Sequence, residues 1–285
     1  MRPEAHEVAF LALAGVTAGA LALAGDGPLV EVLAGAGLYA AAVVSLPPKA
    51  KLAAAYAFAF WFYSAVVRIV PVLRESRFDE ALLTIDRRLF GETPAALFDP
   101  SGWPAAVEAL SAAYLSYHVY LHLALAAAFL RPVEETRRLC RPLYLAFALG
   151  FAGYLLVPAV GPWRAFPALF DRPLTGGLLA AANAHVVEAG SSVYDVFPSL
   201  HVGITLVLLA HDRRHARRRF RVMLPIACLL LVSTIALRYH YAVDLAAGGI
   251  LALAAVWAGR FAGAETPRRP RRIARHADAT GRLLT

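Results

Sequence analysis

Long stretches of apolar residues, rather than short apolar runs separated by polar ones, set the pattern of this chain. Eight stretches approach the roughly 20 apolar residues that a helix needs to cross a bilayer. They run over approximately 8–24, 29–46, 51–72, 104–129, 141–158, 199–210, 221–237 and 241–262. A backbone in lipid must satisfy its own hydrogen bonds, so each stretch is expected to be helical. The pattern predicts an all-α, polytopic integral membrane bundle of about eight spans.

Two long segments fall between the predicted spans. Within 74–103, apolar residues recur at helical spacing with charged residues on the other face, which is typical of a helix lying in the membrane interface. These apolar positions are Phe78, Leu82, Ile85 and Leu89. The segment 159–198 is rich in Gly and Pro but also apolar, so we expect an outer loop packed on the membrane surface.

Three regions are therefore expected. Residues 1–49 hold two N-terminal spans, 50–262 form a six-helix core, and 263–285 form a basic cytoplasmic tail without fixed structure. The first span has a possible signal-peptide cleavage site after Ala24. Its leader carries only Arg2 beside two glutamates, however, so we expect a retained span.

Composition supports the membrane assignment. Hydrophobic residues make up 59% of the chain, charged residues only 17%, and the mean hydropathy is +0.58. A soluble domain has about 25% charged residues, so soluble, disordered, collagen-like and disulfide-scaffold classes are excluded. The two cysteines, Cys140 in an expected polar loop and Cys228 in an apolar run, fall in different layers, and no disulfide is predicted.

The net charge of +8 comes almost entirely from clustered arginines. Such clusters suggest nucleic-acid binding in a soluble protein, but between apolar spans they more often mark the cytoplasmic side. Alternate connections divide the 28 Lys and Arg into 20 and 8. We therefore expect no nucleic-acid partner, both termini in the cytoplasm, and the loops 131–141 and 211–221 on that side. Usage rich in Ala and Arg suggests a GC-rich bacterial genome and hence a bacterial plasma membrane.

Three ionisable residues at membrane depth are the candidates for chemistry. His201 opens the sixth span, and His240 and Asp244 lie where the seventh span meets the eighth, so both places fall at the outer ends of helices. Residues at i and i+4 share a helix face, so Asp244 is expected to accept a proton from His240 and leave its other ring nitrogen as a nucleophile. His201 is then available as a general acid and base.

Other interpretations of these residues remain open at this level. The three groups also suit a structural hydrogen-bond network, a metal site of two histidines and a carboxylate, or a proton relay in a transporter, although no internal repeat of the transporter kind is visible. His118 and His122 in the fourth span share one face. They suit a metal site or, more simply, an interior stripe that lines a pocket.

Two motifs resemble a known family. Pro198-Ser199-Leu200-His201, followed about forty residues later by His240-Tyr241-Ala242-Val243-Asp244, is similar to the second and third signature motifs of the type 2 phosphatidic acid phosphatase superfamily. The resemblance implies a six-helix core over roughly 50–262 and a phosphohistidine intermediate formed without metal or organic cofactor. It implies His240 as nucleophile, Asp244 as its orienter, His201 as acid and base, and Ser199 as a phosphate hydrogen-bond donor.

The chain also departs from that pattern. Leu200 replaces the usual Gly, Thr234 stands where an arginine is expected, and the first motif is missing. The Pro-Ser-Leu-His form, Gly161-Pro162-Trp163-Arg164 and Asp86…Leu89-Phe90-Gly91 look more like the inositol phosphorylceramide synthase branch.

Outer-side arginines must then neutralise the phosphate. Arg164 and Arg238 are the main candidates, ahead of Arg87 and Arg88, although an arginine at a helix end can also serve only as an interfacial anchor. The sequence as a whole predicts an outward-facing lipid phosphotransferase. Its donor would be a membrane phospholipid or isoprenyl phosphate and its acceptor a lipid or polyol alcohol. The alternative is a lipid phosphate or isoprenyl (di)phosphate phosphatase with the same site.

Overall fold

The computed structural model describes residues 3–261, and within them the chain is helical and contains no strand. The helices in chain order are α1 (Ala5–Ala24), α2 (Leu29–Ser45), α3 (Pro48–Leu73), α4 (Asp79–Phe90), α5 (Pro94–Leu97), α6 (Pro104–Phe129), α7 (Val133–Leu156), α8 (Pro162–Ala165), the 3-10 turn η1 (Pro167–Leu169), α9 (Leu178–Gly190), α10 (Leu200–His215), α11 (Arg217–Ala236) and α12 (Ala242–Phe261). The expected tail, 263–285, lies outside the described residues.

The eight expected spans coincide with α1, α2, α3, α6, α7, α10, α11 and α12. Six of these are long and apolar enough to cross a membrane, whereas α2 has 17 residues and α10 has 16. The prediction of an all-α polytopic membrane bundle is confirmed. Local signals set several helix boundaries: Gly25 ends α1 with φ +72°, and Pro48 and Pro104 occupy the first helical positions of α3 and α6.

The predicted loop 131–141 is mostly helix. α7 begins at Val133, and Cys140 is buried within it. Arginines at this depth are neutralised by the N-terminal segment, because Glu4 pairs with Arg137 at 2.8 Å and with Arg141 at 2.7 Å. The expected span counts only apolar residues, so it begins at residue 141, after the arginines. The helix in fact begins at Val133.

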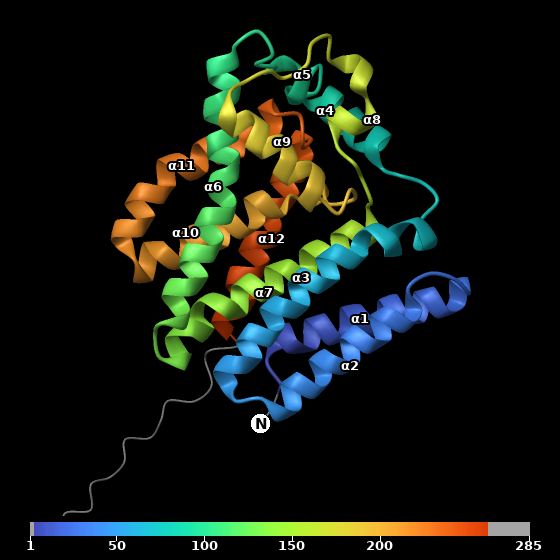
Figure 1. Cartoon of the computed structure of the whole chain (residues 1–285), viewed down its shortest axis with the longest axis vertical. Coiled ribbons are helices and arrows are strands. Elements are labelled where there is room, and N and C mark those ends of the chain that lie inside the picture. Colours follow the sequence, from blue (N-terminus) through green and yellow to red (C-terminus); the bar gives the residue numbers. More distant parts are fainter. Residues whose placement is uncertain (1–2, 262–285) are drawn as a thin grey trace, which may run out of the picture.

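One continuous core joins the spans. It draws buried residues from α1, α2, α3, α6, α7, α10, α11 and α12. The α1–α2 hairpin packs against α3 and α7 along one edge of the bundle (Figure 1). Phe10, Tyr39 and Phe58, one from each of α1, α2 and α3, make mutual ring contacts there. The two N-terminal helices are thereby integrated with the rest of the bundle.

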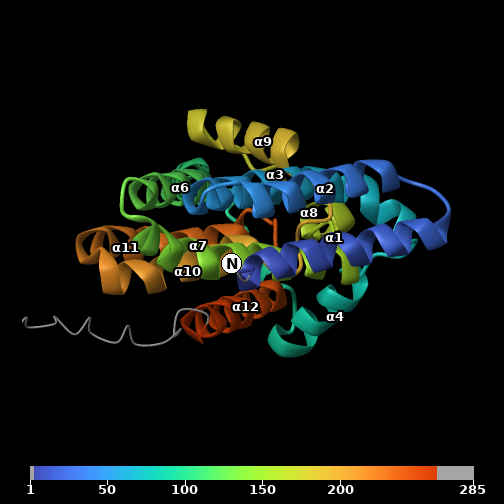
Figure 2. The same cartoon turned by 90° about the horizontal axis from the view of Figure 1, so that it is seen from below.

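The bundle has two chemically different ends. At the arginine-rich end, defined here by the turns 130–132 and 215–217, Lys49 donates to the carbonyl of Arg131 at 2.9 Å. At the site end, defined by the starts of α10 and α12, the short helices α4, α5, α8 and α9 gather (Figure 1). Seen from below, α9 lies on one face and α4 with α12 on the opposite face (Figure 2).

The predicted outer loop 159–198 contains a true helix. α9 is attached to α6 through Glu108, whose carboxylate accepts from the backbone N–H groups of Gly177, Leu179 and Ala180 at 2.7–3.0 Å. These N–H groups belong to the first turn of α9 and the residue before it, which have no partners within the helix. Asn183 of α9 donates to the hydroxyl of Tyr239 at 3.0 Å, so the helix is fixed against the site end.

The predicted interfacial helix forms as α4, but its orientation differs from the expectation. Leu82 is buried as expected, whereas Leu89 is 66% exposed and the carboxylates of Asp79 and Asp86 are turned inward. Those carboxylates accept hydrogen bonds from backbone N–H groups of neighbouring segments, which replaces the water that the sequence pattern predicts around them.

Candidate active site

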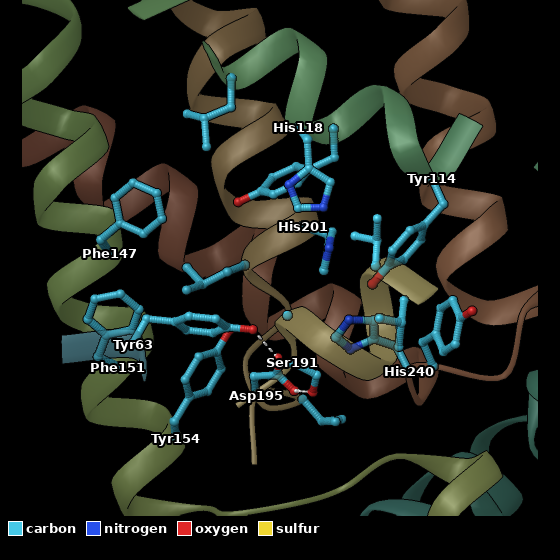
Figure 3. A pocket seen from close by; sticks show the side chains of 18 of the residues that line it. Tyr63, Tyr114, His118, Phe147, Phe151, Tyr154, Ser191, Asp195, His201 and His240 are labelled. Carbon is cyan, nitrogen blue, oxygen red and sulfur yellow. Dashed lines mark hydrogen bonds between the residues drawn. The ribbon is translucent and has the colours of Figure 1, made fainter. Parts of the chain in front are cut away.

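A cavity of about 220 Å³ lies at the site end of the bundle. Helices α3, α6, α7 and α9, the first turn of α10 and the segments around Arg164, Asp195 and His240 supply its lining. His201 and His240 turn into it from different elements (Figure 3). Two of the three principal candidates, separated by 39 positions in the chain, thus share one cavity.

His240 lies in a turn ahead of α12 rather than on the helix itself. Its backbone N–H and that of Tyr239 both donate to the carbonyl of Thr234 at 3.1 Å. Its Nδ1 lies 3.4 Å from Oδ2 of Asp244, which stands in the first turn of α12. The predicted contact therefore forms, but the predicted reason is wrong: a turn brings the pair together, not a shared helix face.

Asp244 is fully buried and incompletely satisfied. Its Oδ2 also accepts from the backbone N–H of Tyr241 at 2.8 Å, while Oδ1 has no hydrogen-bond partner among the described residues. A buried carboxylate of this kind favours the tautomer of His240 that carries its proton on Nδ1. It also favours any positive charge that develops on the ring.

The other nitrogen of His240 faces Ser199. The Oγ of Ser199 lies 3.3 Å from Nε2, and the same hydroxyl caps α10 by accepting from the N–H of Val202. Ser199 is fully buried and is not part of the cavity lining. With the proton of His240 on Nδ1, Nε2 is a lone-pair acceptor beside a hydroxyl donor.

His201 stands in the first turn of α10, with its ring centroid 5.7 Å from that of His240 and the ring planes 68° apart. Tyr114 and Tyr117 of α6 pack against it, with centroids at 4.6 and 4.5 Å. The His201 ring is directed into the cavity, with Tyr114 and His240 nearby (Figure 3). At their separation of 5.7 Å the two imidazoles are in edge-to-face contact, and both border the same cavity.

Leu200, which departs from the family motif, packs against a glycine of α7. Its side chain lines the cavity and lies against Gly150, where an added Cβ would come within 2.4 Å of it. Any larger residue at 150 would force this leucine to move. The leucine thus adds apolar surface beside His201 without displacing α10.

Arg164 lines the cavity, as a phosphate-binding residue would. The loop that carries it turns at Gly161, whose φ is +85° and whose Cβ position is blocked by the carbonyl of Tyr239 at 2.4 Å, so that only glycine fits. The guanidinium lies over the Trp163 ring at 4.6 Å and donates to Ser191 Oγ at 3.3 Å. None of these contacts is with a carboxylate.

Arg238 is directed elsewhere. Its guanidinium donates to Asp99 at 2.6 and 3.2 Å and lies over the Phe170 ring at 4.4 Å, and it is not part of the cavity lining. Its backbone has φ +67°, an uncommon conformation for a non-glycine residue. The structure therefore does not bring the two candidate arginines together, because Asp99 already neutralises one of them.

Two inward-facing aspartates of α4 support the site, although the sequence predicts a site role for neither and Asp86 enters there only as part of a family-like segment. Asp79 accepts from the N–H groups of Val160 and Gly161 and from the hydroxyl of Tyr241, at 3.0–3.2 Å. Burial raises the pKa of Asp79, and these hydrogen bonds act in the opposite direction. Asp86 accepts from the N–H groups of Ala242 and Val243 and so caps α12. α4 thus fixes both the Arg164 loop and the helix of Asp244.

A sequence comparison identifies the family. A family model described as the PAP2 superfamily matches residues 80–258, which is more than half of the chain and includes every site residue described above except Asp79. The chain belongs to the PAP2 superfamily. Members are phosphatases or phosphotransferases, so the protein is an enzyme of the class that acts on lipid phosphates. No curated protein and no solved structure matches it significantly.

Some polar residues in and near the cavity lie outside the two motifs that resemble the PAP2 family. His118 and His122 line the cavity, and His122 Nε2 lies 3.0 Å from the Tyr56 hydroxyl of α3. Arg87 is exposed and pairs with Glu92. Within residues 3–261, no three His, Cys, Asp or Glu side chains are placed to share a metal ion. His122 thus links α6 to α3 at the cavity through Tyr56.

Proposed function

We propose that this PAP2 protein transfers a phosphorylated head group from a membrane phospholipid to an alcohol, through a phosphohistidine on His240. The observation that carries the proposal is the pairing of two imidazoles in one cavity, of which only His240 is backed by a buried carboxylate. The resemblance of the Ser199–His201 motif and the Arg164 segment to the inositol phosphorylceramide synthase branch supports the choice of transfer over hydrolysis.

In the first half of the reaction, Nε2 of His240 attacks phosphorus and the bond from phosphorus to the departing alcohol oxygen breaks. Nδ1 keeps its proton, and the Asp244 carboxylate stabilises the positive ring that results. His201, protonated at this stage, donates its proton to the departing oxygen. Arg164, which lines the cavity, donates to the phosphate oxygens, whose charge must be neutralised in the transition state, and Ser199 donates once its hydroxyl turns from Nε2 to the phosphate bound there.

In the second half, the acceptor alcohol loses its proton to His201, its oxygen attacks phosphorus and the bond from phosphorus to Nε2 breaks. His201 is thereby protonated again and His240 is neutral, so the site returns to its starting state. Water in place of the alcohol gives hydrolysis by the same steps. The apolar surface added by Leu200 beside His201 supports the exclusion of water.

The charges around the cavity favour a phosphodiester over a phosphate monoester. Among the described residues that line it, the Arg, Lys, Asp and Glu side chains are Arg164 and Asp195. A monoester carries about −1.5 to −2 at pH 7, and Arg238, which would be a second cation, is held by Asp99. A diester carries a single negative charge that one arginine can balance, and phospholipid head groups are joined by such diesters.

The apolar part of the cavity supports a lipid substrate. Its lining extends to Phe60 of α3 and Leu121 of α6, and Phe60 is 56% exposed on the outside of the bundle. A lipid whose phosphate lies at His240 has a path for its tails between these helices into the bilayer. The asymmetry of 20 against 8 basic residues supports an outward-facing site.

The test is product analysis with purified protein in liposomes. Phosphatidic acid, an isoprenyl phosphate, and a phospholipid diester with a lipid alcohol are supplied separately, and free phosphate and new phospholipid are measured by mass spectrometry. We expect an acceptor-dependent phospholipid from the diester, and acid-labile phosphate on the protein when the acceptor is withheld. Rapid phosphate release from phosphatidic acid, without any acceptor-dependent product, would contradict transfer and leave a phosphatase.

A further inference from the structure

The cavity contains a carboxylate that the proposed chemistry does not use. Asp195 lines it, and its Oδ1 accepts from Ser191 Oγ at 3.0 Å, while its Oδ2 accepts from the Tyr63 hydroxyl and from the N–H of Ser192. No Lys or Arg among residues 3–261 forms an ion pair with it. A charge held at membrane depth by neutral donors alone is by default a functional residue.

Asp195 and Arg164 are held apart by a single hydroxyl. Arg164 donates to Ser191 Oγ at 3.3 Å, and Ser191 donates to Asp195 at 3.0 Å, so two hydrogen bonds in series separate the opposite charges. Val193, between these residues in the chain, has φ +67°, which is strained for a β-branched side chain. The loop thus holds a conformation in which both charged residues line the cavity, bridged by Ser191 and without a direct ion pair.

Aromatic rings surround the carboxylate on the side away from the histidines. Tyr63, Phe151 and Tyr154 line the cavity, with centroids 6.2 Å apart between Tyr63 and Phe151 and 6.1 Å between Phe151 and Tyr154. Figure 3 shows these three rings beside Ser191 and Asp195, and His201 and His240 on the other side. Aromatic faces attract ammonium groups, and a nearby carboxylate adds to the attraction.

We propose that Asp195, with the rings of Tyr63 and Tyr154, binds the ammonium group of a zwitterionic phospholipid whose phosphate lies on Arg164. This subsite specifies the head group of the donor lipid in the phosphotransfer proposed above, and it rests on that proposal for the position of the phosphate. In such a head group two carbons separate the phosphate from the ammonium. This spacing matches that of Arg164 and Asp195, which are separated by the Ser191 hydroxyl. The subsite thus selects amine-bearing diesters over anionic ones.

Binding to an inactive variant tests the subsite without turnover. In the His240→Ala protein we measure, by the fluorescence of Trp163 and the other tryptophans, the affinities for short-chain phosphatidylethanolamine, its N-acetylated form and phosphatidylglycerol. We expect phosphatidylethanolamine to bind about 10- to 100-fold more tightly than the other two, because only its amine is charged. Adding Asp195→Asn should remove that preference, whereas Asp171→Asn, at an exposed outer carboxylate, should leave it unchanged.

The possible results separate this subsite from the transfer reaction. Equal affinities for the three lipids in the His240→Ala protein overturn the subsite, even if Asp195→Asn fails to fold. A preference that survives Asp195→Asn in a folded protein overturns the role of this carboxylate and shows that Asp195 serves only to hold its loop. An Asp195-dependent preference in the His240→Ala protein, together with a wild-type protein that forms no phosphohistidine, supports the subsite and contradicts the proposed function.

Discussion

Two fully buried aspartates, Asp212 and Asp244, lie at opposite ends of the packed pair α10 and α12. At the arginine-rich end, both oxygens of Asp212 accept from the guanidinium of Arg219, and Oδ2 also accepts from the Tyr120 hydroxyl at 2.9 Å. The carboxylate has a permanent cation, and its hydrogen bonds join α10, α11 and α6.

Asp244, at the site end, is equally buried but differently satisfied. Its partner His240 carries a positive charge only when it is protonated or phosphorylated. The Oδ1 atom of Asp244 has no hydrogen-bond partner among the described residues. The contrast separates a structural ion pair from the pair to which the proposed mechanism gives the chemistry. Burial is the same, but only Asp244 is arranged to interact more strongly with a charge that develops during a reaction than with its resting neighbour.

The largest effect is expected at His240, the proposed nucleophile and the partner of Asp244. His240→Ala removes the nitrogen that bonds to phosphorus, so lipid transfer and protein-bound phosphate should both fall to background. Labelling with a radioactive donor lipid, followed by acid and alkali treatment, measures the intermediate. His185→Ala is the matched control, because His185 is exposed on α9. Wild-type labelling in the His240→Ala protein would place the nucleophile elsewhere.

The two aspartates can be compared directly by the same substitution. Asp244→Asn should lower kcat by as much as about 10⁴-fold, because an amide does not fix the imidazole tautomer or stabilise its charged form. Asp212→Asn should leave kcat of the folded protein within a few-fold of wild type. Initial rates at matched amounts of monodisperse protein measure both. Equal losses of kcat would show that the arginine-rich end is coupled to the chemistry.

A smaller loss is expected from the second imidazole. His201→Ala should reduce the rate by about 10²–10⁴-fold, the usual contribution of a general acid or base. A donor whose leaving group needs no proton, such as a nitrophenyl phosphodiester, should recover most of the first half-reaction, which release of nitrophenol measures. Failure of that recovery would point to a role in binding rather than in proton transfer.

The smallest effect on chemistry is expected at Arg219. Arg219→Ala leaves Asp212 buried without its cation, and the protein should lose about 1–3 kcal/mol of stability. The thermal midpoint in detergent should fall, while kcat at low temperature stays near that of wild type. Arg218→Ala, at an exposed neighbour in the same turn, is the control. A normal midpoint would indicate that water or lipid replaces the guanidinium.

Much of the fold follows from physical constraints that are local in sequence. A backbone in lipid has few options, so apolar length alone predicts the spans, and even the short α10 is recognisable because Val196 to Pro198 extend its apolar run. His201, His240 and Asp244 stand out because ionisable groups at membrane depth are costly. The spans and these three residues can be predicted without knowing which segments contact each other in the folded protein.

The remaining site features depend on contacts between distant segments. Asp99 lies 139 positions from Arg238, so nothing near this arginine in sequence indicates that it is occupied. Asp79 and Asp86 read as the solvent face of an amphipathic helix, yet their partners are backbone N–H groups 81 and 156 positions away. Periodicity identifies which residues are polar, but not whether water or buried backbone satisfies them.

The position of α4 has a mechanical consequence for substrate binding. Asp79 binds the loop that carries Arg164, and Asp86 binds the start of α12, which carries Asp244. The same short helix, α4, therefore fixes the positions of both segments. The segments that carry Arg164 and Asp244 are therefore not expected to close on a substrate by moving toward each other. If the phosphate binds at His240 as proposed, its alignment is set before the lipid arrives, and the lipid head group adjusts to a rigid site.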